Sequence, residues 1–198
     1  MKAFYIIASI VVLILLMQSY QLISKNFKTE NQKYRTVFKD TQFEIRFYPA
    51  ATFAKIYSTG TDYKSVSGSG FKKLAGYIFG GNDQGKSISM TAPVRMELSE
   101  KGSTMSFVMP EKYKEADLPK PKDASVHIVK SSPQYVAVIG FGGYADDEKI
   151  KERRDFLLKL IQDKGIKVAG PYTFLGYNAP FQFWGRKNEV VIPIVWKE

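Results

Sequence analysis

Hydrophobic and polar positions follow two different periods along this chain, and the change from one to the other separates helices from strands. Over residues 63–78 the apolar side chains recur at intervals of three and four, as Phe71, Leu74 and Ile78 do. This spacing places them on one face of an amphipathic helix. The sequence Gly-Gly-Asn follows directly after Phe79. These residue types close helices, so the helix is predicted to end there.

The period changes to two after residue 86. Ile88, Met90 and Met96 belong to a row of apolar residues that alternates mainly with polar ones over residues 87–98. This pattern predicts a strand with one apolar face. Pro93 has no N–H to donate to a neighbouring strand, so we expect this strand to lie at an edge, or to be bent or bulged at that position.

The same two periods predict the other elements. A second helix begins at the acidic residues 146–148 and carries an apolar stripe that includes Ile150, Leu157 and Ile161. Each half of the domain therefore has the order strand, strand, helix, strand, strand. We predict an α+β fold in which about eight largely antiparallel strands form a twisted sheet or barrel from two pseudo-repeated halves, with two packed α-helices. The further strands are expected at residues 43–48, 52–57, 104–109, 126–130, 135–141, 172–177 and 189–196.

The first residues of the chain are almost wholly apolar. Residues 3–17 contain one polar side chain, and with residues 18–23 the segment reaches 21 residues, about 31 Å of helix at about 1.5 Å per residue. The sequence SYQLISK at its end has no small-x-small cleavage site. We therefore predict an uncleaved signal anchor, a transmembrane helix over residues 1–23, followed by a polar linker at 24–33 and a domain at 34–198.

This anchor predicts a protein attached to a membrane by a single N-terminal helix. Lys2 favours a cytoplasmic N-terminus, whereas Lys25, Lys28 and Lys33 beyond the segment reduce that bias. We expect the domain to lie on the extracytoplasmic, periplasmic side.

Composition limits the chemistry that the domain can perform. The net charge is +10, but the 29 basic residues are dispersed and accompany no nucleic-acid motif, so no nucleic-acid partner is predicted. The chain has no cysteine and one histidine, which excludes disulfides, cysteine-bound metals and thiol nucleophiles. No catalytic triad or acid pair stands out, and we predict that the protein is not an enzyme. Glu44, Glu97 and Glu189 are interpreted as outward-facing strand positions.

Residues 80–87 match the nucleotide-binding pattern GxxxxGK[ST]. That chemistry needs the order strand, loop, helix, because the phosphates bind at the N-terminal end of a helix. Here the order is helix, loop, strand, and the carbonyl groups at a helix C-terminus repel phosphate. We therefore predict no nucleotide binding and interpret Lys86 as a solvated loop residue.

Six ordered motifs stand out along the chain: AGYIFGGN (75–82), KSISMTAPV (86–94), FVMPEKY (107–113), LPKPKD (118–123), FGGYA (141–145) and RKNEVVIPI (186–194). Together they resemble the SOUL haem-binding protein family, and the likeness covers residues 34–196. The resemblance implies a twisted antiparallel barrel built from two halves with a helix on each. It also implies non-catalytic binding of haem or another tetrapyrrole in an apolar cleft beside the first helix.

A porphyrin needs an apolar slot and cations for its propionates. The first helix and the following strand offer apolar side chains that are also ordinary candidates for a core between helix and sheet. Lys72 and Lys73 on the same helix could reach the propionates, or could simply be solvated. The apolar candidates for haem binding are Phe71, Leu74, Ala75, Ile78, Met90 and Met96.

His127 is the one histidine that could ligate a haem iron. Val126 and Ile128 should share one face of its strand, so His127 points to the other. A single histidine on a strand is more typical of a surface or structural position, and we expect any haem to be held mainly by apolar contact.

An alternative function keeps the same fold and pocket. The domain could be an effector-binding module for another amphipathic small molecule, without haem. Titration with haemin separates the two functions, because only tetrapyrrole binding gives a saturable Soret shift.

Overall fold

The computed structural model describes residues 29–197. The predicted anchor at residues 1–23 lies outside this range. Within the part of the chain that is described, no helix is both long and apolar enough to cross a bilayer.

The described elements are two long helices, a short 3-10 helix and a series of strands. In chain order they are β1 (Glu30–Asn31), β2 (Arg35–Lys39), β3 (Glu44–Tyr48), β4 (Thr52–Ser58), α2 (Tyr63–Ile78), β5 (Thr91–Ala92), β6 (Val94–Ser99), β7 (Gly102–Val108), η1 (Glu115–Asp117), β8 (His127–Lys130), β9 (Gln134–Gly142), α3 (Asp147–Asp163), β10 (Thr173–Gly176) and β11 (Lys187–Ile194).

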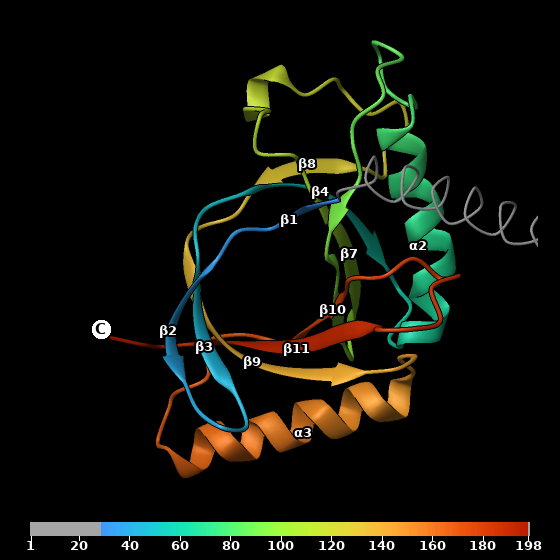
Figure 1. Cartoon of the computed structure of the whole chain (residues 1–198). Helices are drawn as coiled ribbons and strands as arrows, with labels where there is room; N and C mark the ends of the chain where they lie inside the picture. Colours follow the sequence, from blue (N-terminus) through green and yellow to red (C-terminus); the bar gives the residue numbers. More distant parts are fainter. Residues whose placement is uncertain (1–28, 198) are drawn as a thin grey trace, which may run out of the picture. The chain divides into compact units, whose positions relative to one another are not determined.

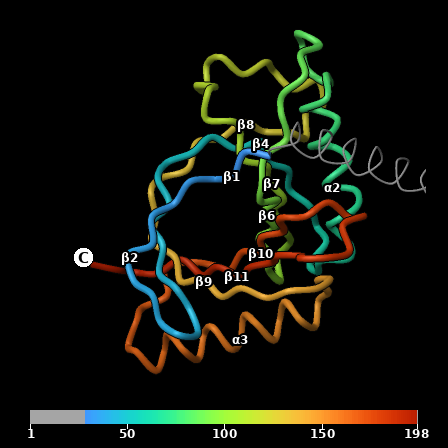
Figure 2. The backbone as a smooth tube through the Cα atoms, in the orientation of Figure 1, coloured from blue at the N-terminus to red at the C-terminus, as the bar shows by residue number. Residues whose placement is uncertain are grey.

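Nine of these strands form one antiparallel sheet in the order β2-β3-β9-β11-β10-β6-β7-β4-β8. The sheet curls, and the two helices lie on its outer side (Figure 1, Figure 2). Helix α2 packs on β4 and β7, and α3 packs on β9 and β11. The predicted α+β class, the antiparallel pairing and the two helices are confirmed. The sequence pattern missed β2, which pairs with β3 across a register shift.

Alternation along the strands gives the sheet two different faces. The outer face is apolar and packs against the helices, as Met105 and Phe107 do. The inner face carries polar and charged residues beside a small apolar cluster: Arg95 pairs with Leu175 across β6 and β10, and Lys55 pairs with Ser106 across β4 and β7. The domain therefore places its main core between sheet and helices, and charged groups inside the curl.

The strand predicted over residues 87–98 is shorter and divided. The strand is interrupted at Pro93, where a bend or bulge was predicted, and the Ala92–Pro93 peptide bond is cis. The predicted start was wrong, because Ser87 forms only an isolated bridge with Phe79. Ile88 donates its N–H to the carbonyl oxygen of Ile78 across 2.7 Å, so this segment closes the end of α2 before the sheet resumes.

Candidate functional site

The loop that resembles a phosphate-binding motif is closed by its own side chains. It follows the C-terminal end of α2, which confirms the order helix, loop, strand. Asn82 is fully buried, donates to the carbonyl oxygens of Tyr77 (3.1 Å) and Lys86 (2.7 Å), and accepts from the Lys86 N–H at 3.0 Å. The Lys86 ammonium lies 4.8 Å from the centre of the Tyr113 ring. The loop amide of Lys86 and the Lys86 side chain thus already have partners.

The eight residues predicted to bind haem divide into buried and accessible members. Leu74, Ile78 and Met96 are buried in the core between helix and sheet. Phe71 is 37% exposed and packs edge-on against Phe107. The remaining four are partly buried or exposed: Lys72, Lys73, Ala75 and Met90. A ligand could reach the accessible members, whereas contact with the buried ones would require the core to open.

The segment between β7 and β8 forms a connector that packs along α2. Tyr77 donates its hydroxyl to the carbonyl oxygen of Pro119 at 2.9 Å, and the Lys122 N–H donates to the carbonyl oxygen of Gly81 at 3.0 Å. The ammonium of Lys73 lies 3.2 Å from the hydroxyl of Ser125. Side chains of α2 therefore hold one side of the connector in place.

The other side of this connector lines a cavity of about 610 Å³, which we name the connector groove. Strands β4 and β8 form its second wall. Apolar side chains predominate, and Tyr57, Lys120 and His127 add polar groups. None of the eight predicted haem-binding residues lines it. Its lining residues are Tyr57, Glu115, Ala116, Leu118, Pro119, Lys120, Pro121, Val126, His127, Ile128 and Val129.

His127 lies at the edge of this groove. Its side chain is exposed, and its ring centre is 5.6 Å from that of Tyr57, which is 64% exposed. Val126 is buried on the other face of the strand, as the alternation predicted. The groove thus brings an imidazole and a phenol together beside an apolar surface.

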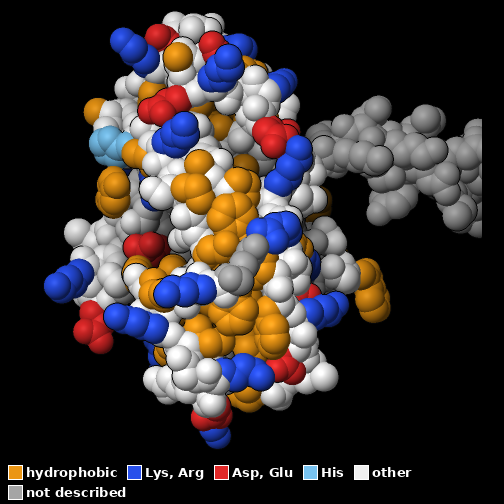
Figure 3. All heavy atoms as spheres, turned by 90° about the vertical axis from the view of Figure 1, so that its left-hand side faces the viewer, with side chains coloured by type: hydrophobic (Ala, Val, Ile, Leu, Met, Phe, Trp, Pro, Cys, Tyr) orange, Lys and Arg blue, Asp and Glu red, His pale blue; other side chains and the backbone are white. Residues whose placement is uncertain are grey.

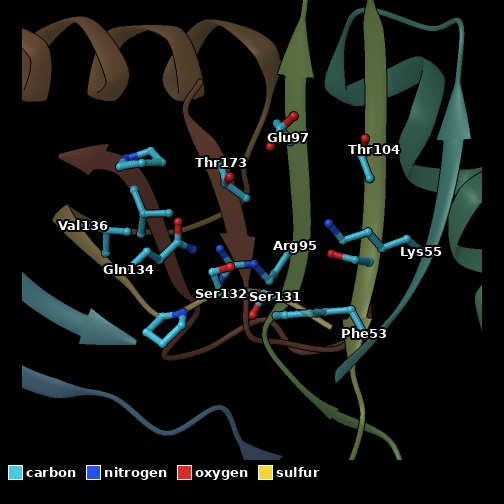
Figure 4. A pocket seen from close by; sticks show the side chains of 14 residues that line it. Phe53, Lys55, Arg95, Glu97, Thr104, Ser131, Ser132, Gln134, Val136 and Thr173 are labelled. Atoms are coloured by element: carbon cyan, nitrogen blue, oxygen red, sulfur yellow. The ribbon is translucent and has the colours of Figure 1, made fainter. Parts of the chain in front are cut away.

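A second cavity, of about 250 Å³, lies on the inner face of the sheet, and we name it the inner cleft. Lys55 on β4 and Arg95 and Glu97 on β6 line it, and Figure 4 shows Ser131, Ser132 and Gln134 nearby. The sequence analysis did not identify this cleft. The strand pattern indicated that these residues share a face, but not that the sheet curls around them.

Arg95 is the most buried charged group of the inner cleft, at 8% exposure. Burial lowers the pKa of its guanidinium. One of its nitrogens donates to the side-chain oxygen of Gln32 at 3.0 Å, and the guanidinium carbon lies 5.7 Å from the ring centres of both Tyr48 and Phe53.

The expectation that Glu189 faces outward was wrong. Its side chain is 2% exposed, and its carboxylate accepts from Arg46 at 2.9 Å and from the hydroxyl of Tyr177 at 2.6 Å. Lys187 lies 3.1 Å from its other oxygen. Burial alone would raise the pKa of Glu189, but the hydrogen bonds from Arg46 and Tyr177 hold that pKa below its ordinary value. The buried carboxylate is a structural ion pair on the inner face.

Basic side chains are scattered over the surface instead of forming one tract. Figure 3 shows lysine and arginine interspersed with acidic and hydrophobic groups on one face of the domain. The view matches the dispersed charge of the sequence.

The curled antiparallel sheet with two helices on its outer side places the domain in the α+β class, and solved structures share this arrangement. The C-terminal domain of EcmrR shares this fold, with a TM-score of 0.62 at 8% identity, over 78% of this chain and 97% of that domain. The family model for the SOUL heme-binding protein matches residues 29–193, and this chain belongs to that family.

Two curated relatives agree with the family assignment. Heme-binding protein 2 of Mus musculus is 32% identical over 75% of this chain and 76% of its own length. Heme-binding protein 1 of Sus scrofa is 26% identical over 77% of this chain and 84% of its own length. The resemblance predicted from the sequence motifs is confirmed.

Proposed function

We propose that the domain binds haem or a related tetrapyrrole without catalysis, and that the connector groove receives it. The observation that carries the function is the family match over residues 29–193, with relatives named for heme binding. The location rests on the size and chemistry of the groove.

The residues of the groove suit a tetrapyrrole. A cavity of about 610 Å³ lies in the range of roughly 300–1,000 Å³ typical of small-molecule sites. Leu118, Val129 and the prolines supply apolar contact, and Lys120 supplies a cation for a propionate. Bound haem would bring an iron, and imidazole and phenolate are side-chain groups that ligate haem iron. His127 and Tyr57 are the groove residues of these types.

The accessible face of α2 remains a second location for the same ligand. Phe71, Lys72 and Lys73 are exposed there and retain the arrangement predicted from the sequence, an aromatic ring beside two cations. Because α2 and the groove lie on opposite sides of the connector, substitutions on each side can be tested separately.

Titration of the full-length protein with haemin tests the function. We expect a saturable Soret shift at one equivalent. Ala116→Trp would fill the groove from an exposed position on η1 and should weaken binding at least tenfold, about 1.4 kcal/mol. Phe71→Ala should change affinity little. Phe156→Ala is the matched control, since Phe156 on α3 has 38% exposure against 37% for Phe71.

Each alternative predicts a different pattern. Weakened binding in Phe71→Ala together with unchanged binding in Ala116→Trp would place the tetrapyrrole on α2. Absence of any saturable Soret change in the parent protein would contradict haem binding and favour an effector-binding module for another amphipathic molecule.

We propose in addition that residues 1–23 anchor the protein in a membrane with its domain on the extracytoplasmic side. The support is the apolar composition of that segment and the lack of a cleavage site. Resistance to carbonate extraction and sensitivity to external protease are the expected results. Recovery of a shortened, soluble form that begins near Ser24 would contradict the anchor.

A further inference from the structure

The inner cleft contains a buried positive charge that forms no ion pair within the described part of the chain. Arg95 is 8% exposed, and none of the ion pairs formed among residues 29–197 involves it. A buried charge without an opposite partner is strongly unfavourable, and buried guanidinium groups are ordinarily paired. The amide of Gln32 and two aromatic rings compensate only in part, because none of them carries a negative charge.

The nearby carboxylates are engaged elsewhere or too far from Arg95. Glu189 already has Arg46, Tyr177 and Lys187 as partners. Glu97 lies two positions along β6 on the same face, and its charge opposes the lowering of the Arg95 pKa by burial. It is exposed, however, and forms no ion pair with Arg95 among the described residues. Figure 4 shows the Glu97 and Arg95 side chains separated along the strand.

A second cation lies beside the same cavity. Lys55 on β4 lines the cleft with Arg95, and the ion pairs of the described residues do not involve it either. Around the two cations stand hydrogen-bonding side chains, among them Ser106 and Gln134. The cleft thus combines two cations that form no ion pair among the described residues, the exposed carboxylate of Glu97, and uncharged hydrogen-bonding groups. Its volume of about 250 Å³ is small for a ligand pocket.

We propose that the inner cleft is a binding site for a small organic anion, whose carboxylate or phosphate group lies between Arg95 and Lys55. Guanidinium groups bind both kinds of oxyanion through paired, charge-assisted hydrogen bonds. Ser106 and Gln134 would contact the uncharged part of the ligand. The site is separate from the connector groove and does not depend on tetrapyrrole binding.

Titration of the full-length protein with inorganic phosphate and with succinate tests the site, with sodium chloride at equal ionic strength as the reference. The side-chain Nε–H resonance of Arg95, assigned from its loss in Arg95→Met, reports on the cleft by NMR. We expect a saturable shift with one of the two anions, and the stronger of them identifies the preferred group. Lys55→Gln should weaken that anion about fivefold, the effect of removing roughly 1 kcal/mol of charge attraction.

Two further variants distinguish an effect on anion binding from an effect on folding and from a change in the net charge of the protein. Lys159→Gln removes the same charge from α3, on the outer side of the sheet, and should leave the affinity within twofold of the parent. Arg95→Met removes the reporter resonance, so its anion binding is followed through the backbone amide resonances of β4 and β6, which should show no saturable shift. Its melting temperature should stay level or rise, because the variant removes an uncompensated buried charge.

The proposal is overturned if neither anion shifts the resonance beyond the chloride reference. It is equally overturned if Lys55→Gln and Lys159→Gln have the same effect on affinity. If Arg95→Met does not fold, the comparison of the two lysine variants still decides the matter.

Discussion

Tyr77 donates its hydroxyl to the carbonyl oxygen of Pro119 across 2.9 Å, and this bond ties α2 to the connector that lines the groove. Tyr77 is 2% exposed, so its bond is shielded from water. Helix α2, on which the sequence analysis placed the haem site, therefore does not line the groove. It stabilises the connector that forms one wall of the groove.

Tyr77→Phe should lower the free energy of unfolding by about 1–3 kcal/mol, because the buried carbonyl of Pro119 loses its donor. Haemin affinity should fall as the connector loosens. The control is Tyr144→Phe, since Tyr144 also bonds a proline carbonyl, that of Pro180, but is 47% exposed and 3.5 Å away. Urea denaturation measures both variants, and equal losses would show that burial of the bond is unimportant.

The same residue predicts sensitivity to alkaline pH. Burial raises the pKa of Tyr77 to about 12, above the value of about 10 for an unfolded tyrosine. A raised pKa means that the folded state favours the protonated phenol. The stability from this group is complete below pH 10 and is lost as the pH rises toward 12. Melting temperatures between pH 9 and 12 should fall more steeply for the parent than for Tyr77→Phe.

The sequence predicted those features that depend on neighbours along the chain. Both helices were found because their apolar spacing is local, and the cap of α2 is local as well, since Asp62 accepts from the Ser65 N–H at 2.8 Å. Burial of Glu189 was missed because its partner Arg46 lies 143 residues away. The curl of the sheet creates that pairing.

The candidate sites differ in the same way. Phe71 and the lysines beside it were identifiable from the period of one helix. The groove could not be predicted in this way, because the connector is a charged, proline-containing segment without an apolar period. Its wall becomes visible only when Tyr77 and Pro119 are known to touch. Arg95 gave no signal either, since a charged residue in an alternating strand is usually solvent-exposed.

The Glu189 network predicts the response to acid. Because the folded pKa of Glu189 lies below its ordinary value, its contribution to stability is present above the unfolded pKa of about 4.3 and is lost as the pH falls through the folded pKa. Glu189→Gln should cost about 3 kcal/mol at neutral pH, since it removes the charge that neutralises buried Arg46.

Glu44→Gln serves as the comparison within this network. Its carboxylate also lies 2.9 Å from Arg46, but its side chain is 25% exposed against 2% for Glu189. Solvent screens the more exposed pair, so the loss should be well below that of Glu189→Gln. Unfolding in urea at pH 7 measures both, and a larger loss for Glu44→Gln would contradict the assignment of Glu189 as the main partner.

Two glycines at the end of α2 should respond in opposite directions to the same substitution. A Cβ at Gly76, inside the helix, would meet no heavy atom within 4 Å. Gly76→Ala should therefore raise the free energy of unfolding by up to about 1 kcal/mol, the difference in helix propensity.

A Cβ at Gly81 would lie 2.6 Å from the carbonyl oxygen of Gly76, which already accepts the Gly81 N–H at 2.8 Å. The obstacle is backbone, so it cannot be relieved by rotating a side chain. Gly81→Ala should lower the free energy of unfolding by about 1–3 kcal/mol. It should also disturb the connector, because Gly81 accepts from Lys122. Chemical denaturation gives the stabilities, and haemin titration the effect on the groove. If Gly81→Ala stabilised the protein as Gly76→Ala is expected to, the described backbone geometry at the end of α2 would be wrong.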